Sequence, residues 1–166
     1  MLVLRFSHVF FGALWVGMMA FQTFFLMPAL AEVGPDAGKV MAALMRRRLP
    51  VILPIVALIT LISGFWLFQR LSGGAAAGLM RTPLGMAFGS GGLAALVAFV
   101  VGIVLVRPAM VRSTQLAQSL ASASPDERAT RSAEIQRIRA RGVTAGWVVM
   151  LLLLYALGSM AVARYL

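Results

Sequence analysis

Four long apolar runs dominate this sequence of 166 residues. They cover approximately residues 4–30, 50–71, 83–106 and 143–165. Each is long enough to cross about 30 Å of hydrocarbon as an α-helix, which needs about 20 residues. Hydrophobic residues make up 61% of the chain and charged residues 12%, far outside the range of soluble globular proteins. We therefore predict an all-α integral membrane protein, in which residues 1–166 form a single domain around a four-transmembrane-helix bundle.

The end of the first apolar run, Ala29-Leu30-Ala31, resembles the A-x-A cleavage pattern of a signal peptide. The apolar run is too long for the core of such a peptide, however. We therefore expect residues 4–30 to be a membrane helix.

The basic residues are distributed unevenly between the two sides of the predicted bundle. Eleven of the fifteen Lys and Arg residues lie in the connections before the second and the fourth helix, and four lie on the opposite side. By the positive-inside rule, this distribution places both connections in the cytoplasm and both termini outside. We expect a bacterial inner (cytoplasmic) membrane protein, with the lipid bilayer as its partner. Because these basic residues lie next to membrane spans, the net charge of +10 does not indicate a nucleic-acid partner.

The largest polar segment, residues 107–142, separates the third and fourth predicted spans. Ser124, Pro125 and Glu127 form the pattern of a capping box, which predicts that a helix begins there. We therefore expect a cytoplasmic helical hairpin extension between the third and fourth helices. It serves either as a solvated spacer or as a docking surface for a partner protein or an anionic lipid.

Pro54 lies in the second predicted helix, a few residues after its start. A proline inside a helix has no N–H to donate and clashes with the preceding turn. We expect Pro54 to bend the helix or to leave a carbonyl group free.

His8 is the only histidine, and it lies inside the first apolar run. An ionisable imidazole is costly inside a membrane, so such a residue usually has a function. It lies roughly 8 Å inside the outer end of the first helix, counted at the rise of an α-helix. Trp15 follows seven residues later on the same face. We expect Trp15 to be packed inside the bundle, either as core or as the wall of a cofactor site.

At the predicted depth of His8, the other three helices carry small or weakly polar residues. These residues are Ser63 and Gly64, then Gly89, Ser90, Gly91 and Gly92, and finally Ser159 and Met160. Glycines remove side-chain bulk, so a neighbouring helix or a flat cofactor can approach the backbone. Gly89, Gly91 and Gly92 therefore predict either close helix packing or clearance beside His8.

An imidazole nitrogen and a thioether sulfur are suitable ligands for haem iron or copper. We therefore name His8 and Met160 as candidate metal ligands. One copy of the chain cannot form a bis-histidine haem, because it has one histidine. The remaining forms are a His/Met or five-coordinate haem b, a copper held by His8 and methionines, and a site shared between subunits. In the plain alternative no cofactor binds, and His8 donates a hydrogen bond to a serine hydroxyl at the same depth, that of Ser63, Ser90 or Ser159.

The patterns of ordinary enzymes are missing from the sequence. There is no Ser/His/Asp set, phosphate-binding loop or metalloprotease spacing, and there is no cysteine. We therefore name no catalytic residue and favour a protein that is not an enzyme.

Two segments carry a resemblance to a known family. "FSHVFFGALWVG" at 6–17 and "GKVMAALMRRRLPVILPIVALITLISGFWLF" at 38–68 resemble the superfamily of copper-resistance protein D (CopD-like) and its short relatives, near the bacterial four-helix protoporphyrinogen oxidases. The resemblance covers roughly the first 70 residues, and elsewhere only the helix count and the "GGLAAL" and "VRP" patterns agree.

This resemblance implies a four-helix unit with a functional histidine early in the first helix, which matches His8, and a tryptophan near the spacing of Trp15. It also implies copper handling or haem b bound through that histidine. The oxidase relatives use a lysine in the third helix, whereas the single lysine here, Lys39, lies in a connection. That departure argues against porphyrinogen oxidation, and the lack of a Met-x-x-Met array argues against copper transport.

Two functions therefore remain open from the sequence. In the first, the protein binds haem b or copper through His8 near the outer face, for electron transfer or for haem or metal handling. In the second, the protein is a structural or accessory subunit of a homo-oligomer or of a larger membrane complex. His8 then ties two helices together.

Overall fold

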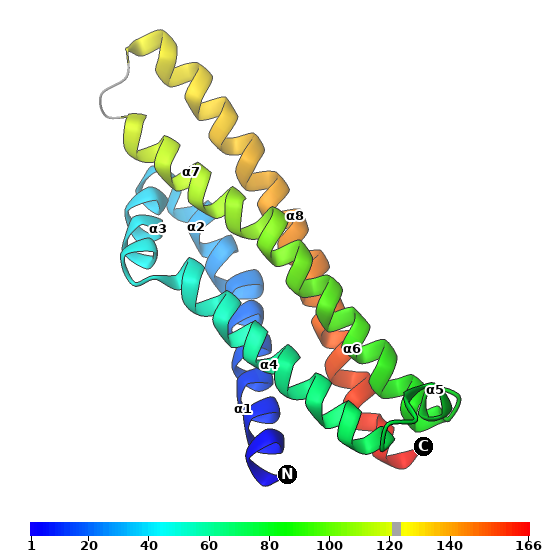
Figure 1. Ribbon diagram of the computed structural model, residues 1–166. Coiled ribbons are helices and arrows are strands. Elements are labelled where there is room, and N and C mark those ends of the chain that lie inside the picture. Colours follow the sequence, from blue (N-terminus) through cyan, green and yellow to red (C-terminus); the bar gives the residue numbers. More distant parts are fainter. Residues whose placement is uncertain (121–123) are drawn as a thin grey trace.

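The computed structural model describes residues 1–120 and 124–166 (Figure 1). It is all-helical, with no strand in the described part of the chain, and four of its helices are long and apolar enough to cross a membrane. The four are the continuous run of α1 (Leu2–Phe21), η1 (Gln22–Leu26) and α2 (Met27–Val33), then α4 (Leu49–Ser72), then the continuous run of α6 (Pro83–Val101), η3 (Gly102–Val106) and α7 (Arg107–Ser119), and finally α8 (Pro125–Val162). The predictions of an all-α chain and of four such helices are confirmed.

Short helices connect these long ones. They are η2 (Gly34–Asp36) and α3 (Ala37–Arg46) between the first and second long helices, α5 (Ala76–Leu79) between the second and third, and η5 (Ala163–Tyr165) after α8. The turn before α5 contains Gly73 and Gly74, both with positive φ, a conformation that glycine adopts without steric cost.

Two helix starts follow directly from their local sequence. The Thr82 hydroxyl accepts a hydrogen bond from the Gly85 N–H at 3.1 Å, and Pro83 occupies the first position of α6. Before α8, the Ser124 hydroxyl accepts from the Glu127 N–H at 3.4 Å, while the Glu127 carboxylate accepts from the Ser124 N–H at 3.0 Å. The capping box predicted at Ser124 is therefore confirmed.

Two π-helical turns interrupt the first and third long helices. Each ends two residues before a proline, η1 before Pro28 and η3 before Pro108. A proline nitrogen cannot donate, and its ring crowds the carbonyl four residues earlier, so the helix widens locally to keep its other carbonyl groups bonded. Such turns are frequent at functional sites.

The long helices pack as two pairs, α1 with α4 and α6 with α8, and α7 continues along α8. Figure 1 shows the N-terminal end of α1 diverging from the ends of α6 and α8 that lie nearest to it. The Arg112 guanidinium donates to the Glu134 carboxylate at 2.6 Å, which links α7 to α8.

The two pairs meet in one apolar core that contains side chains from all four long helices. Its buried members are Trp15, Met19, Val56, Ala57, Ala94, Ala95, Ala98, Val149, Met150, Leu153 and Ala156. Alanines are numerous in this set, and small side chains let membrane helices approach closely.

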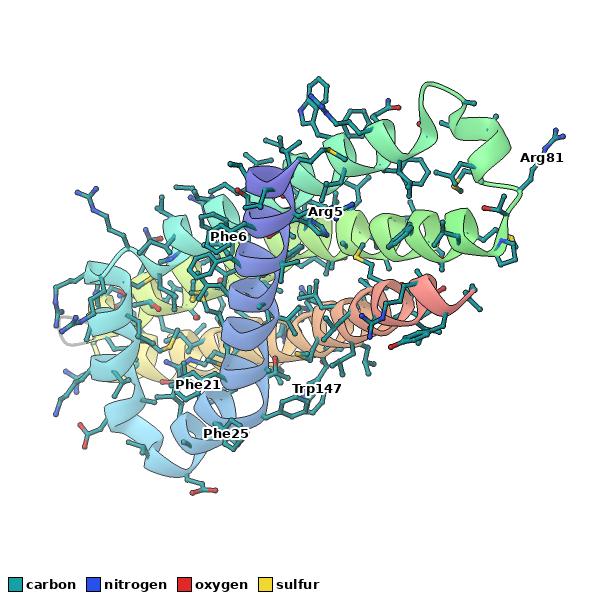
Figure 2. All side chains as sticks on the ribbon, turned by 90° about the horizontal axis from the view of Figure 1, so that it is seen from below. Arg5, Phe6, Phe21, Phe25, Arg81 and Trp147 are labelled. Carbon is teal, nitrogen blue, oxygen red and sulfur yellow. The ribbon has the colours of Figure 1, made fainter. Side chains whose placement is uncertain are left out.

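Large apolar side chains cover much of the outer surface. Phe6, Phe21, Phe25 and Trp147 are exposed, and Figure 2 shows them on the first long helix and on α8. A soluble monomer rarely exposes so much contiguous apolar surface. In a lipid bilayer these side chains contact hydrocarbon and not water, so their exposure agrees with four helices that are long and apolar enough to cross a membrane.

Candidate functional site

The imidazole of His8 lies against α4 and is half-buried. Its Nδ1 atom is 3.0 Å from the backbone carbonyl oxygen of Thr60. A carbonyl oxygen only accepts, so this contact requires the tautomer in which Nδ1 carries the proton and donates it. In that tautomer Nε2 carries a lone pair, and it is the nitrogen that is available to a ligand.

The close approach of His8 to α4 depends on Gly64. A Cβ atom built at Gly64 would lie 2.7 Å from the His8 Cε1 atom, closer than real Cβ contacts allow. The absence of a side chain at this position therefore lets the ring approach the helix backbone closely. The prediction that Gly64 lies at the depth of His8 is confirmed.

The partner of His8 is a backbone carbonyl, whereas the alternative without a cofactor predicted a serine hydroxyl. The Ser63 hydroxyl donates to the carbonyl of Ile59 at 2.7 Å and to that of Thr60 at 3.0 Å. Ser90 and Ser159 also donate to carbonyls three residues earlier in their own helices. Serines inside helices commonly satisfy their hydroxyls in this way, so these three hydroxyls have acceptors within their own helices.

The predicted glycines and Met160 lie in the other helix pair. A Cβ atom built at Gly91 would collide with the Ser159 hydroxyl and would lie 3.5 Å from the Met160 Cε atom. Gly89 instead faces the side chain of Met80, and Gly92 faces open space. Gly91 therefore serves close packing of α6 on α8, while His8 contacts Gly64 of α4.

Trp15 and the cavity beside it form the place where all four long helices meet. Trp15 is 2% exposed, which confirms that it is packed inside the bundle. It lines a cavity of about 40 Å³ whose other lining residues are mostly apolar. They include Met19, Pro50, Pro54, Ala98, Gly102, Met110 and Val149, and the two polar side chains of Gln22 and Arg107. Both π-helical turns contribute to this lining, Gln22 from η1 and Gly102 from η3.

Arg107 makes a hydrogen bond at this cavity that sequence reasoning anticipated only in part. Pro54 has no N–H for the Pro50 carbonyl, which would otherwise bond four residues ahead. The Arg107 Nε–H donates to that carbonyl at 3.0 Å. The prediction that Pro54 frees a carbonyl is thus confirmed, whereas the residue that satisfies it lies 57 positions away and carries no local sequence signal.

Among the residues that the structure describes, the other ionisable groups form no metal site. In the described part of the chain, no group of three or more His, Cys, Asp or Glu residues could hold a metal ion. Lys39 lies in α3 and pairs with Asp36 at 2.6 Å, and the hydrogen bond to Asp36 raises the pKa of Lys39. The only nitrogen ligand available to a metal inside the predicted spans is therefore the His8 imidazole.

Comparison with known proteins adds no relative to this description. No protein-family model, no curated protein and no solved structure matches the chain.

Proposed function

We propose that this protein binds haem b in a membrane through the Nε2 atom of His8, with copper as the alternative metal, and that it serves in electron transfer or in haem or metal handling. The observation that carries the proposal is the hydrogen bond from His8 Nδ1 to the Thr60 carbonyl. Histidines that ligate metals usually donate their other N–H to a carbonyl or a carboxylate, which fixes the tautomer and the ring orientation. Haem b supplies one-electron redox chemistry when it is bound.

The residues around His8 fit a metal with one protein ligand. The ring is oriented by Thr60 and given room by Gly64, and the residue is half-buried. Met160 packs beside Gly91 in the other helix pair. A second ligand from Met160 would require the two helix pairs to approach each other near His8. The five-coordinate form and the site shared between two copies of the chain do not require this movement of the helices.

The membrane placement of the proposed site follows from charge. The excess of basic residues before α4 and before α8 supports a bacterial inner membrane with both termini outside, which places His8 near the outer face. We propose that α7 and the first part of α8 form the cytoplasmic helical hairpin extension. The salt bridge between Arg112 and Glu134 and the hydrogen bond from Arg131 to the Ser119 carbonyl support this hairpin.

The test is the absorption spectrum of the purified protein together with elemental analysis for iron and copper. The proposal predicts a Soret band or stoichiometric copper, lost in His8→Ala and retained in Gly17→Ala. Gly17 lies on the same helix and faces open space, so its variant is a matched control. Absence of both signals, or equal signals in wild type and His8→Ala, contradicts the proposal.

The second candidate is a structural or accessory subunit that binds no cofactor, and the same hydrogen bond favours it. A net contribution of about 0.5–1.5 kcal/mol is typical for such a bond. On this account, His8→Ala lowers the free energy of unfolding by about that amount, and the protein copurifies with a membrane complex without bound metal. A metal-free protein whose stability and assembly do not change in His8→Ala contradicts both the cofactor site and the role of His8 as an interhelical hydrogen-bond residue.

A further inference from the structure

His8 is part of a stripe of α1 side chains that begins at Arg5 and continues through Gly12 to Trp15. Spacings of three and four residues place these positions on one face of an α-helix. A Cβ atom built at Gly12 would lie 3.5 Å from the Thr60 Cγ2 atom, and Trp15 is buried. The stripe therefore faces the other helices, and Arg5 lies on it about 4.5 Å beyond His8 toward the N-terminal end of α1.

The Arg5 guanidinium has no protein partner in the described part of the chain. It forms no hydrogen bond or ion pair there, and the residue is exposed. Figure 2 shows Arg5 and the exposed Phe6 on different sides of α1. A guanidinium is always charged and carries five N–H donors. The position of Arg5 on the inward-facing stripe therefore leaves these donors to a ligand or to solvent.

The five acidic residues lie toward the other end of the bundle. They are Glu32 and Asp36, close to the connection before α4, and Asp126, Glu127 and Glu134, close to the connection before α8. Figure 1 shows these connections at the end opposite to the N-terminus of α1. Within residues 1–120 and 124–166 no acidic side chain pairs with Arg5, whereas an anionic ligand bound at His8 would supply the counter-charge.

We propose that Arg5 binds a propionate carboxylate of the haem b that His8 ligates. This inference rests on the function proposed above and deepens it, because it selects a carboxylated porphyrin over a copper ion. A guanidinium forms paired, charge-assisted hydrogen bonds with a carboxylate, whereas it repels a metal cation. Since Arg5 lies further along α1 than His8, the propionate edge of the porphyrin is directed toward the N-terminal end of this helix.

The test compares two ligands that differ only in charge. The full chain in phosphatidylcholine nanodiscs is titrated with haem b and, separately, with the dimethyl ester of haem b, whose carboxylates are uncharged. The change in the Soret band gives the half-saturation concentration for each ligand. We expect wild type to bind haem b more tightly than the ester. Arg5→Gln is expected to weaken the binding of haem b by about three- to tenfold, because an ion pair close to water is partly screened, and to leave the binding of the ester unchanged.

Two further variants separate the charge of Arg5 from other effects. Arg5→Lys keeps the charge and is expected to retain most of the preference for haem b over the ester. Arg81→Gln removes an exposed arginine from the connection between α5 and α6, away from α1 in Figure 2, and is expected to change neither titration.

The outcomes distinguish this inference from the function on which it rests. An equal loss of affinity for both ligands in Arg5→Gln would mean that Arg5 acts on the helix or on lipid headgroups, and it overturns the inference. A Soret response that is lost in His8→Ala, together with the same preference for haem b in wild type and Arg5→Gln, overturns the inference alone. A wild-type protein that gives no Soret response to either ligand overturns both the inference and haem b as the cofactor of His8.

Discussion

At the scale of single residues, the contact between His8 and α4 depends on the absence of a side chain at Gly64. This absence lets the His8 ring come close enough to α4 to donate a hydrogen bond to the Thr60 carbonyl. The ring is rigid and is held at Nδ1, so it has little freedom to move away from an added methyl group. This pair is therefore the most sensitive point of the candidate site.

Gly64→Ala tests that contact. The added Cβ would lie 2.7 Å from the His8 Cε1 atom, so the ring or the helix must shift and the bond to Thr60 weakens. We expect the free energy of unfolding in mixed micelles to fall by about 1–3 kcal/mol, and any haem signal to fall with it. Gly92→Ala, in open space on α6, is the control and is expected to change neither. Equal effects of the two substitutions would show that Gly64 has no special role.

At the scale of elements, the starts of α4 and α7 are joined by one side chain. Pro54 removes a hydrogen bond from inside α4, and Arg107 replaces it from α7. The carbonyl of a buried proline is thereby satisfied, and two long helices from different pairs are fixed to each other. The basic residue at the end of a span thus has a structural role in addition to its effect on orientation.

A double-mutant cycle between Arg107 and Pro54 measures this link. Arg107→Gln leaves the Pro50 carbonyl without its donor, which we expect to cost about 1–3 kcal/mol of unfolding free energy. In Pro54→Ala the helix supplies its own N–H, so the same substitution is expected to cost less than about 0.5 kcal/mol. Additive effects, measured by denaturation of all four proteins, would mean that the two residues do not act on one carbonyl.

At the scale of the whole molecule, the fold class could be predicted from the sequence. The length of the apolar runs predicts helices that cross a membrane, and the capping motif predicts where a helix begins. The depth count also placed Gly64 correctly beside His8. Which helices pack as pairs was not predictable, because the depth of a residue along its helix does not determine which face of that helix contacts a neighbouring helix. As a result, Gly91 and Met160 share the depth expected for His8 but pack within another pair.

The cavity beside Trp15 illustrates the same limit. The sequence predicted that Trp15 is buried, and the structure confirms it. The contribution of Gln22 and Arg107 to one cavity depends on two π-helical turns and on contacts between distant segments. Of the prolines there, only Pro54 supported a prediction of irregular helix geometry, and a proline indicates a broken hydrogen bond without identifying its replacement.

The orientation of the whole molecule is open to a direct test, because the chain contains no cysteine. Ala75→Cys, in the turn before α5, is expected to react with a membrane-impermeant thiol reagent in intact spheroplasts. Ser132→Cys, in the exposed part of α8, is expected to react only after permeabilisation. The reverse pattern would place both termini in the cytoplasm and His8 near the inner face.

The central claim is that Thr60 holds His8 with Nδ1 protonated and Nε2 ready to bind a ligand. Since His8 is the only histidine, ¹⁵N NMR of the histidine-labelled protein reports on this ring alone. The account predicts a protonated Nδ1 and an unprotonated Nε2 in the metal-free protein, and a shift of the Nε2 signal when haem b is added while Nδ1 keeps its proton. A proton on Nε2 in the metal-free protein, with no response to haem or copper, would contradict it.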